Sequence, residues 1–203
     1  MQYLLIIFLF VSTVGVAQDK IMLMNGKIKT VGKVLEIKDR NVLYQAKGSK
    51  RIKKMGWEKV FSIETAAGRE QVVYLQDSTI SNDLSIEQMR LFVKGEQAAI
   101  YRYKSPLSTI GGLVFGAAGG LLVPYFPAVS VLPPAAGITA LAFVKPKSSK
   151  KSIVGIPDEV SSSPEFVAGY QRKAKDKRMN NTLKGAAVGF LLTVGAIVAF
   201  RGL

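Results

Sequence analysis

The chain of 203 residues contains no cysteine and no histidine. Without cysteine it has no disulfide framework, no thiolate nucleophile and no acylation site of the lipoprotein kind. Without histidine as well, zinc, haem and iron–sulfur sites lose their usual ligands, and a catalytic triad with a histidine base is excluded. No phosphate-binding loop, dinucleotide fingerprint or nucleophile elbow occurs in the sequence. We therefore expect no cofactor and no metal, and the chain is not expected to be an enzyme.

Acidic residues are also scarce, since 14 Asp and Glu stand against 28 Lys and Arg. The apolar residues are gathered in three blocks, residues 4–16, 105–144 and 183–200. Residues 105–144 carry no charge at all, and the third block carries only Lys184, near its start. Pumps and secondary transporters usually place a charged residue within a membrane segment. Apart from Lys184, at the start of its block, the three apolar blocks contain no charged residue, so we do not expect a pump or a secondary transporter.

The first apolar block is too short to cross a bilayer, because a hydrocarbon core of about 30 Å needs about 20 helical residues. Its length is typical of the apolar region of a signal peptide, and the small residues Gly15-Val16-Ala17 follow where a signal peptidase cuts. We expect residues 1–17 to be a signal peptide, with an uncleaved anchor as the alternative. In both cases the chain from Gln18 onward begins outside the cytoplasm.

Residues 18–78 alternate short β-prone runs with turn residues, as in a small all-β unit. Asn25-Gly26 is the best hairpin signal, because both residues tolerate positive φ. We expect five or six strands in a barrel-like head. Its predicted core residues are Ile21, Leu23, Val34, Leu43, Trp57, Phe61, Ile63, Val72 and Tyr74.

The opening of this head, with a strand, Asn25-Gly26 and then Gly32 in a long second strand, resembles the Sm-like and SH3-like small barrels. A cluster of Lys and Arg at residues 47–54 could bind phosphate groups. Export argues against a nucleic acid, and we expect no nucleic-acid partner. The alternative partner of this basic hairpin is the anionic headgroups of membrane lipids.

Residues 84–104 follow as an amphipathic connector helix, in which Gly95 is expected to weaken the middle. Pro124 and Pro127 then break the long apolar run, so that residues 106–144 are expected to form a helical hairpin. Residues 145–181 read as a basic linker with an amphipathic helix, and residues 183–200 as a C-terminal transmembrane helix. The predicted fold class is therefore an α+β membrane protein with two to three transmembrane helices.

The number of crossings stays open at this point. If the run of residues 106–144 crosses twice, the basic loop lies outside the cytoplasm with the head, against the positive-inside rule. If the run crosses only once, the loop lies inside and the rule is obeyed, but a long apolar stretch broken by prolines must fold back. The length of the run favours the hairpin.

Two rows of small residues recur at four-residue spacing in the apolar blocks. They are Gly112, Gly116 and Gly120 in one row, and Gly185, Gly189 and Thr193 in the other. Small residues at this spacing line one helix face and let two helices approach to backbone contact within lipid. We therefore predict these six residues to be helix-packing residues, either within one chain or between chains of a homo-oligomer.

Several short motifs accompany this pattern: the opening DKIMLMNGKIKTVGKVLEI, Gly95-Glu96-Gln97-Ala98 before an aromatic pair, and Gly169-Tyr170 followed by Lys177-Arg178 before the last glycine-rich helix. Together they resemble uncharacterised envelope proteins of Bacteroidota. The resemblance implies export and membrane residence, and it carries no known activity. The expected function is a membrane-anchored envelope protein whose exported head binds a protein or wall partner. The alternative is a glycine-zipper oligomer that forms a pore or an assembly platform.

Overall fold

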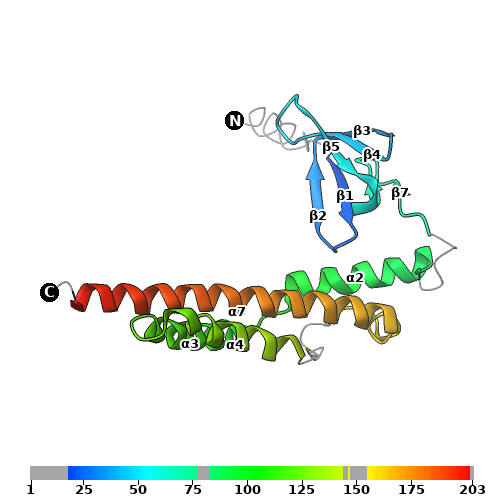
Figure 1. Cartoon of the computed structure of the whole chain (residues 1–203). Coiled ribbons are helices and arrows are strands. Elements are labelled where there is room, and N and C mark those ends of the chain that lie inside the picture. The colour runs from blue at the N-terminus through cyan, green and yellow to red at the C-terminus, as the bar shows by residue number, and fades with distance from the viewer. Residues whose placement is uncertain (1–17, 77–82, 144–145, 147–154, 202–203) are drawn as a thin grey trace, which may run out of the picture. The chain divides into compact units, whose positions relative to one another are not determined.

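The computed structural model describes residues 18–76, 83–143, 146 and 155–201. The chain divides into two compact units, residues 1–86 and residues 87–203. The first unit consists of strands and the second of helices, so the fold is α+β (Figure 1). The predicted signal peptide, residues 1–17, lies outside the described residues, as do residues 77–82 and most of the linker between 144 and 154.

The described part of the β head contains seven strands, where the sequence predicted five or six. They are β1 (Asp19–Leu23), β2 (Ile28–Val31), β3 (Lys33–Lys38), β4 (Asn41–Gln45), β5 (Ile52–Gly56), β6 (Val60–Glu64) and β7 (Glu70–Val72). β1 and β2 form the antiparallel hairpin predicted at Asn25-Gly26, and Gly26 has the positive φ of 73° that this turn requires. A short 3₁₀ helix, Trp57–Lys59, joins β5 to β6.

These strands make two sheets rather than a closed barrel, which corrects the barrel-like prediction. One sheet has the order β2-β1-β6-β7 and the other has the order β3-β4-β5. Gly32 separates β2 from β3 and passes the chain from one sheet to the other, with its amide donating to the carbonyl of Gln45 at 2.9 Å. The short β7 and the strand β5 end the two sheets, so the ring of pairing is not completed.

The core of the head lies between the sheets. On two segments, the residues that are buried are the sequence neighbours of the residues that we predicted to be buried. Ile21, Phe61 and Ile63 are buried as expected. On β4 the buried residues are Val42 and Tyr44 instead of Leu43, and beyond β7 it is Val73 instead of Val72. Side chains alternate between the two faces of a strand. A prediction that is wrong by one residue therefore places the buried side chains on the exposed face and the exposed side chains on the buried face. Trp57 packs against the edge of this core while remaining partly exposed.

A buried carboxylate ties three parts of the head together. Asp19, at the start of β1, is 6% exposed. Its Oδ2 accepts a hydrogen bond from the amide of Val34 at 2.6 Å, and its Oδ1 accepts one from the amide of Ala66 at 2.7 Å. Hydrogen bonds to an ionised acceptor are short and strong. Asp19 thus fixes β3 and the β6–β7 turn relative to β1, across the two sheets.

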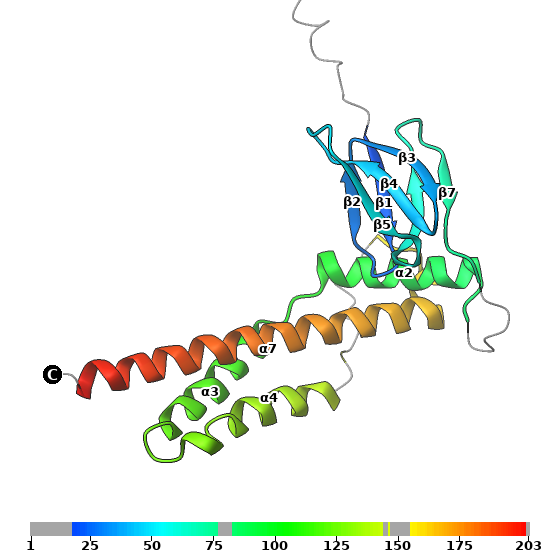
Figure 2. The ribbon, with the colours of Figure 1, turned by 45° about the horizontal axis from the view of Figure 1, so that its top comes forward.

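Every regular element among the described residues of the second unit is a helix. Its elements are α2 (Ile86–Arg102), α3 (Pro106–Leu122), the 3₁₀ helix η2 (Pro127–Val129), α4 (Leu132–Phe143), α6 (Asp158–Ser161) and α7 (Pro164–Arg201). α2 continues through Gly95 as one helix. α7 is one helix of 38 residues, so the predicted amphipathic helix and the predicted C-terminal transmembrane helix are continuous. Figure 2 shows α3 and α4 lying along the C-terminal part of α7.

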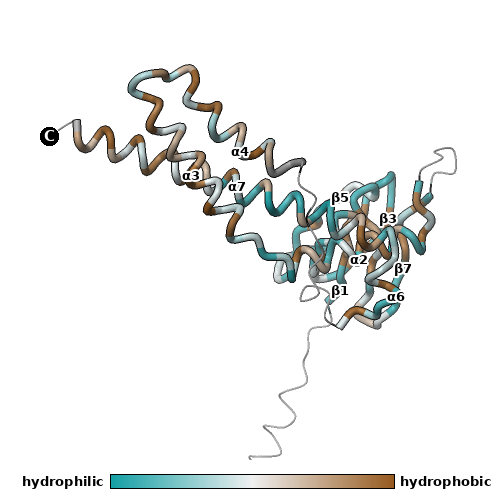
Figure 3. Tube along the Cα trace, turned by 90° about the horizontal axis from the view of Figure 1, so that it is seen from below, coloured by the Kyte–Doolittle hydropathy of each residue, from teal (hydrophilic) through white to brown (hydrophobic). Residues whose placement is uncertain are grey.

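By length and composition, one described helix, α7, is able to cross a membrane. α2 and α3 pass the same test only as a pair that is bent by 69°, and the helix from Pro127 to Ala140 is shorter. Hydrophobic residues gather on α3, α4 and the C-terminal part of α7, whereas the N-terminal part of α7 is largely hydrophilic (Figure 3). The apolar segment of α7 from residue 183 onward is about 27 Å long at 1.5 Å per residue.

Candidate functional site

The predicted glycine rows face each other across α3 and α7. A Cβ atom built on Gly112 would collide with the backbone carbonyl of Thr182, and one built on Gly116 would collide with that of Ala186. At the far end, a Cβ on Gly120 would lie 2.8 Å from the Cβ of Thr193. The two helices are therefore in backbone contact, and any larger side chain at these positions has no space.

The row on α7 contacts α3 in the same way. A Cβ on Gly185 would collide with the carbonyl of Thr109, and one on Gly189 with the carbonyl of Leu113. Residue numbers increase together along the contact, from Gly112 beside Thr182 to Gly120 beside Thr193, so α3 and α7 run parallel. The structure brings all six predicted residues together within one chain.

Other glycines of the same helices have open space around them. Gly111, on α3, and Gly195, on α7, would meet nothing within 4 Å if a Cβ were added. The contact is therefore restricted to one face of each helix. These two positions provide matched controls for the packing role of their neighbours.

α4 folds back along α3 through a second set of close contacts. A Cβ on Gly119 would collide with the carbonyl of Ser130, and one on Gly137 would lie 2.5 Å from a ring carbon of Phe115. Here residue numbers increase on α4 as they decrease on α3, so the two helices are antiparallel. The start of α3 and the end of α4 consequently lie at the same end of the hairpin.

Sequence reasoning missed a third close contact, between α2 and the first half of α7. A Cβ on Gly95 would collide with the carbonyl of Phe166, and one on Gly169 with that of Phe92. Beside them Phe166, Tyr170 and Ala174 are fully buried. Gly95 and Ala99 show the same four-residue spacing as the predicted rows, and this signal could have identified the contact. Their place in a charged helix instead suggested that Gly95 was only a weak point.

Lys177 joins the end of α2 to α7. Its ammonium donates to the carbonyls of Ala99, Ile100 and Tyr103 at 3.2, 2.8 and 2.8 Å. These carbonyls lie in the last turn of α2 and just beyond it, where helix amides become scarce. Ala99 also accepts a hydrogen bond from the amide of Tyr103 at 3.1 Å. Burial lowers the pKa of the Lys177 ammonium, so desolvation offsets part of what the three bonds contribute.

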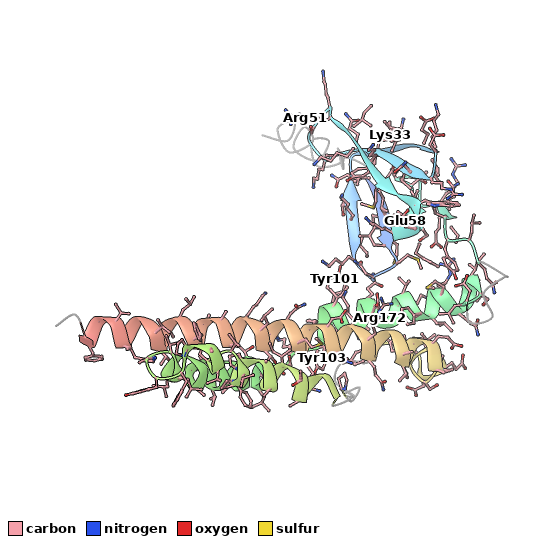
Figure 4. The ribbon with its side chains drawn as sticks, in the orientation of Figure 1. Lys33, Arg51, Glu58, Tyr101, Tyr103 and Arg172 are labelled. Carbon is pink, nitrogen blue, oxygen red and sulfur yellow. The ribbon has the colours of Figure 1, made fainter. Side chains whose placement is uncertain are left out.

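Glu96 is the fully buried acid of this junction. Its side chain is 2% exposed, and its Oε1 lies 3.7 Å from Nε of Arg172, a residue of α7 whose own side chain is 67% exposed. Within the described part of the chain, Glu96 Oε2 is a buried side-chain atom without a hydrogen-bond partner. Figure 4 labels Arg172 on α7, together with Tyr103, whose ring packs edge-on against that of Tyr170.

The described residues also line two cavities. One, of about 290 Å³, lies in the helical unit and is lined by Lys94, Gln97, Ala98, Tyr101, Arg102, Ile156, Val160 and Phe166. The other, of about 220 Å³, lies in the head and is lined by Met24, Trp57, Glu58, Val60, Val73, Tyr74 and Leu75. Among the described residues no group of three or more Asp and Glu is placed to hold a metal ion.

The basic cluster of the head lies on β5 and on the turn before it. Lys47, Lys50, Arg51, Lys53 and Lys54 are all exposed. Lys33 and Arg51 are labelled on the head in Figure 4. Tyr44, which a nucleic-acid interface would use for stacking, is 3% exposed and belongs to the core. A buried ring is not available to a base, so stacking on Tyr44 is excluded while the charge remains accessible.

Comparison with known proteins finds no matching family model, no similar curated protein and no similar solved structure. Function is therefore argued from the chain's own residues.

Proposed function

We propose that the chain is a membrane-anchored structural or interaction protein of the bacterial cell envelope, whose β head binds a protein or wall partner outside the cytoplasm. The observation that carries the anchor is a band of exposed large apolar side chains on the helical unit. Leu107 of α3 is 80% exposed, and Leu191 and Phe200 of α7 are 68% and 81% exposed. Contiguous apolar exposure on this scale marks a surface that is covered by lipid or by another protein.

The antiparallel α3–α4 hairpin supports one particular threading of the proposed anchor. Because α3 and α4 are antiparallel, the basic linker after α4 emerges on the side from which α3 enters. This holds whether the hairpin crosses the bilayer or is re-entrant. α7 then enters parallel to α3. No apolar segment separates the head from α2 in the sequence, so the head and the linker share one side of the membrane.

The glycine contacts favour the anchor over the pore or assembly platform. The rows of α3 and α7 are occupied by each other within one chain, to the point of backbone contact. They are therefore not free to join neighbouring chains. A homo-oligomer would have to use the other faces of these helices, which carry exposed large apolar residues such as Leu107 and Leu191.

The naturally cysteine-free chain allows the threading to be measured by labelling with a membrane-impermeant thiol reagent in intact cells. We expect single cysteines at Lys47, in the head, and at Ser162, before α7, to be labelled without permeabilisation. Tyr125, between α3 and α4, is expected to stay unlabelled. Labelling of Lys47→Cys only after permeabilisation would place the head in the cytoplasm. Opposite behaviour of Lys47→Cys and Ser162→Cys would refute the hairpin.

The 220 Å³ cavity of the head is the proposed contact for the partner, because it offers apolar walls beside the exposed Leu75. The cavity has the aromatic side chains of Trp57 and Tyr74 in its wall, and pockets of this kind receive the anchor residues of a partner at protein interfaces. We expect a photo-crosslinking amino acid at Leu75 to trap a discrete partner in cells. Ile52, on β5, is equally exposed at 63% and lies outside the cavity, so it is the matched control. Identical products from both positions would remove the cavity from the interface.

A further inference from the structure

Glu96 is held in a place that does not suit an ionised carboxylate. Its side chain is almost fully excluded from water, and Oε2 has no hydrogen-bond partner among the described residues. Its cation, Arg172, lies 3.7 Å away from Oε1 and remains largely in solvent. The guanidinium carbon also lies 5.7 Å from the ring centroid of Phe92, so Arg172 is shared between two interactions. A buried charge needs close pairing and hydrogen bonds on its remaining lone pairs. Glu96 has an ion pair of 3.7 Å on Oε1, and its Oε2 has no hydrogen-bond partner among the described residues.

The surrounding backbone gives Glu96 little room to become hydrated. Gly95, its neighbour in sequence, touches the carbonyl of Phe166, and Gly169 touches the carbonyl of Phe92 on the preceding turn of α2. The two helix backbones are thus in contact along the turn of α2 that leads up to Glu96, and the Glu96 side chain itself is 2% exposed. Water can reach Oε2 only if α2 and α7 move apart. Ionisation of Glu96 and separation of these helices are therefore coupled.

The charged groups around Glu96 act in opposite directions. Burial is the largest influence and raises the pKa of the Glu96 carboxyl, and Asp176 raises it further. Arg172 and Lys173 lower the pKa, but the net direction remains upward. All three charged groups come from α7. The acids of α6, Asp158 and Glu159, are exposed to solvent.

The positions one turn away from Glu96 on its own helix are uncharged. They are Phe92, Val93, Ala99 and Ile100. No group on α2 at these positions therefore counters the desolvation of the carboxyl.

We propose that Glu96 makes the α2–α7 junction sensitive to protons: the helices stay clamped while Glu96 carries a proton and loosen when it ionises. The packed state binds this proton more tightly than the separated helices do. The stabilising effect is therefore complete below the ordinary carboxyl pKa of 4.5 and is lost as the pH rises through the raised value of the packed state. The packing of α2 on the first half of α7 therefore depends on the pH around the protein.

Hydrogen–deuterium exchange of the purified full chain in detergent tests this, from about pH 4 to about pH 8. Exchange of the α2 peptide is compared at each pH with that of Glu96→Gln, which keeps the shape and cannot ionise. We expect protection of wild-type α2 to fall tenfold or more relative to Glu96→Gln as the pH rises. Glu87→Gln is the matched control, because Glu87 is also on α2 but is 83% exposed. It should keep the wild-type pH dependence.

Several outcomes would overturn the proposal. If Glu96→Gln follows the wild-type pH course, another group is the sensor. If Glu96→Gln is loose at every pH, the ionised pair of Glu96 with Arg172 holds the helices together instead. Arg172→Gln gives an independent readout, also where Glu96→Gln fails to fold. Removing this cation should move the loosening of α2 to higher pH, and an unchanged or lower midpoint contradicts the role of Glu96.

Discussion

Replacing Gly116 with alanine is expected to destabilise the helical unit by about 3 kcal/mol or more, because overpacking a tight contact forces the backbone to move. The added Cβ would collide with the carbonyl of Ala186, a backbone atom that has no rotamer with which to escape. Helix propensity acts in the opposite direction, since alanine is favoured over glycine by about 1 kcal/mol in a helix interior. The steric effect is the larger one. Gly116→Leu should separate α3 from α7 altogether.

The measurement is the midpoint of thermal unfolding of the purified chain in detergent. Gly111→Ala is the matched control on the same helix, because its Cβ would meet nothing within 4 Å. We expect Gly111→Ala to leave the midpoint unchanged or to raise it. Val114→Leu, at a position 60% exposed, should also be tolerated. A change in oligomeric state with no change in midpoint would mean that the glycines join chains, and the pore or platform would then be favoured.

Replacing Lys177 with methionine is the second change for which we expect a large effect. Methionine has a flexible side chain of similar length and no donor, so the carbonyls of Ala99, Ile100 and Tyr103 lose their shared partner. Hydrogen bonds from a charged donor contribute about 1.5–3 kcal/mol each, and the desolvation of the ammonium offsets part of this. We expect a net loss of roughly 2–4 kcal/mol, confined to the packing of α2 on α7.

Thermal unfolding combined with hydrogen exchange of α2 measures this change. Lys175→Met, at an exposed position half a turn away on α7, removes the same charge without removing a cap. It should leave α2 protected. If Lys175→Met and Lys177→Met have equal effects, the loss of charge on α7 is responsible and the capping bonds contribute little. If α3 loosens together with α2, the two contacts along α7 form one cooperative unit.

Local patterns predicted the elements of this protein well. The Asn25-Gly26 turn, the strands around it and the apolar segments all follow from spacing and hydropathy over a few residues. The prediction failed where the answer depends on more distant parts of the chain. Leu43 and Val72 were assigned to the core one residue out of phase, because β4 and β7 do not alternate clearly enough to fix the buried face. The barrel does not close, because β5 and β7 end their sheets without pairing with each other, and such long-range pairing is not visible in the local pattern.

The sequence by itself determined which residues of the glycine rows can approach another helix, since four-residue spacing places them on one face whatever the partner. Only the tertiary structure decided that partner: α3 runs parallel to α7, and Gly112 meets Thr182 from a position 70 residues away. The same holds for the α2–α7 junction. Glu96 and Lys177 look like ordinary solvated charges in their own helices, and nothing in the local pattern indicates otherwise. They lose water because Gly95 and Gly169 let two distant backbones touch, and such contacts exist only in the folded chain.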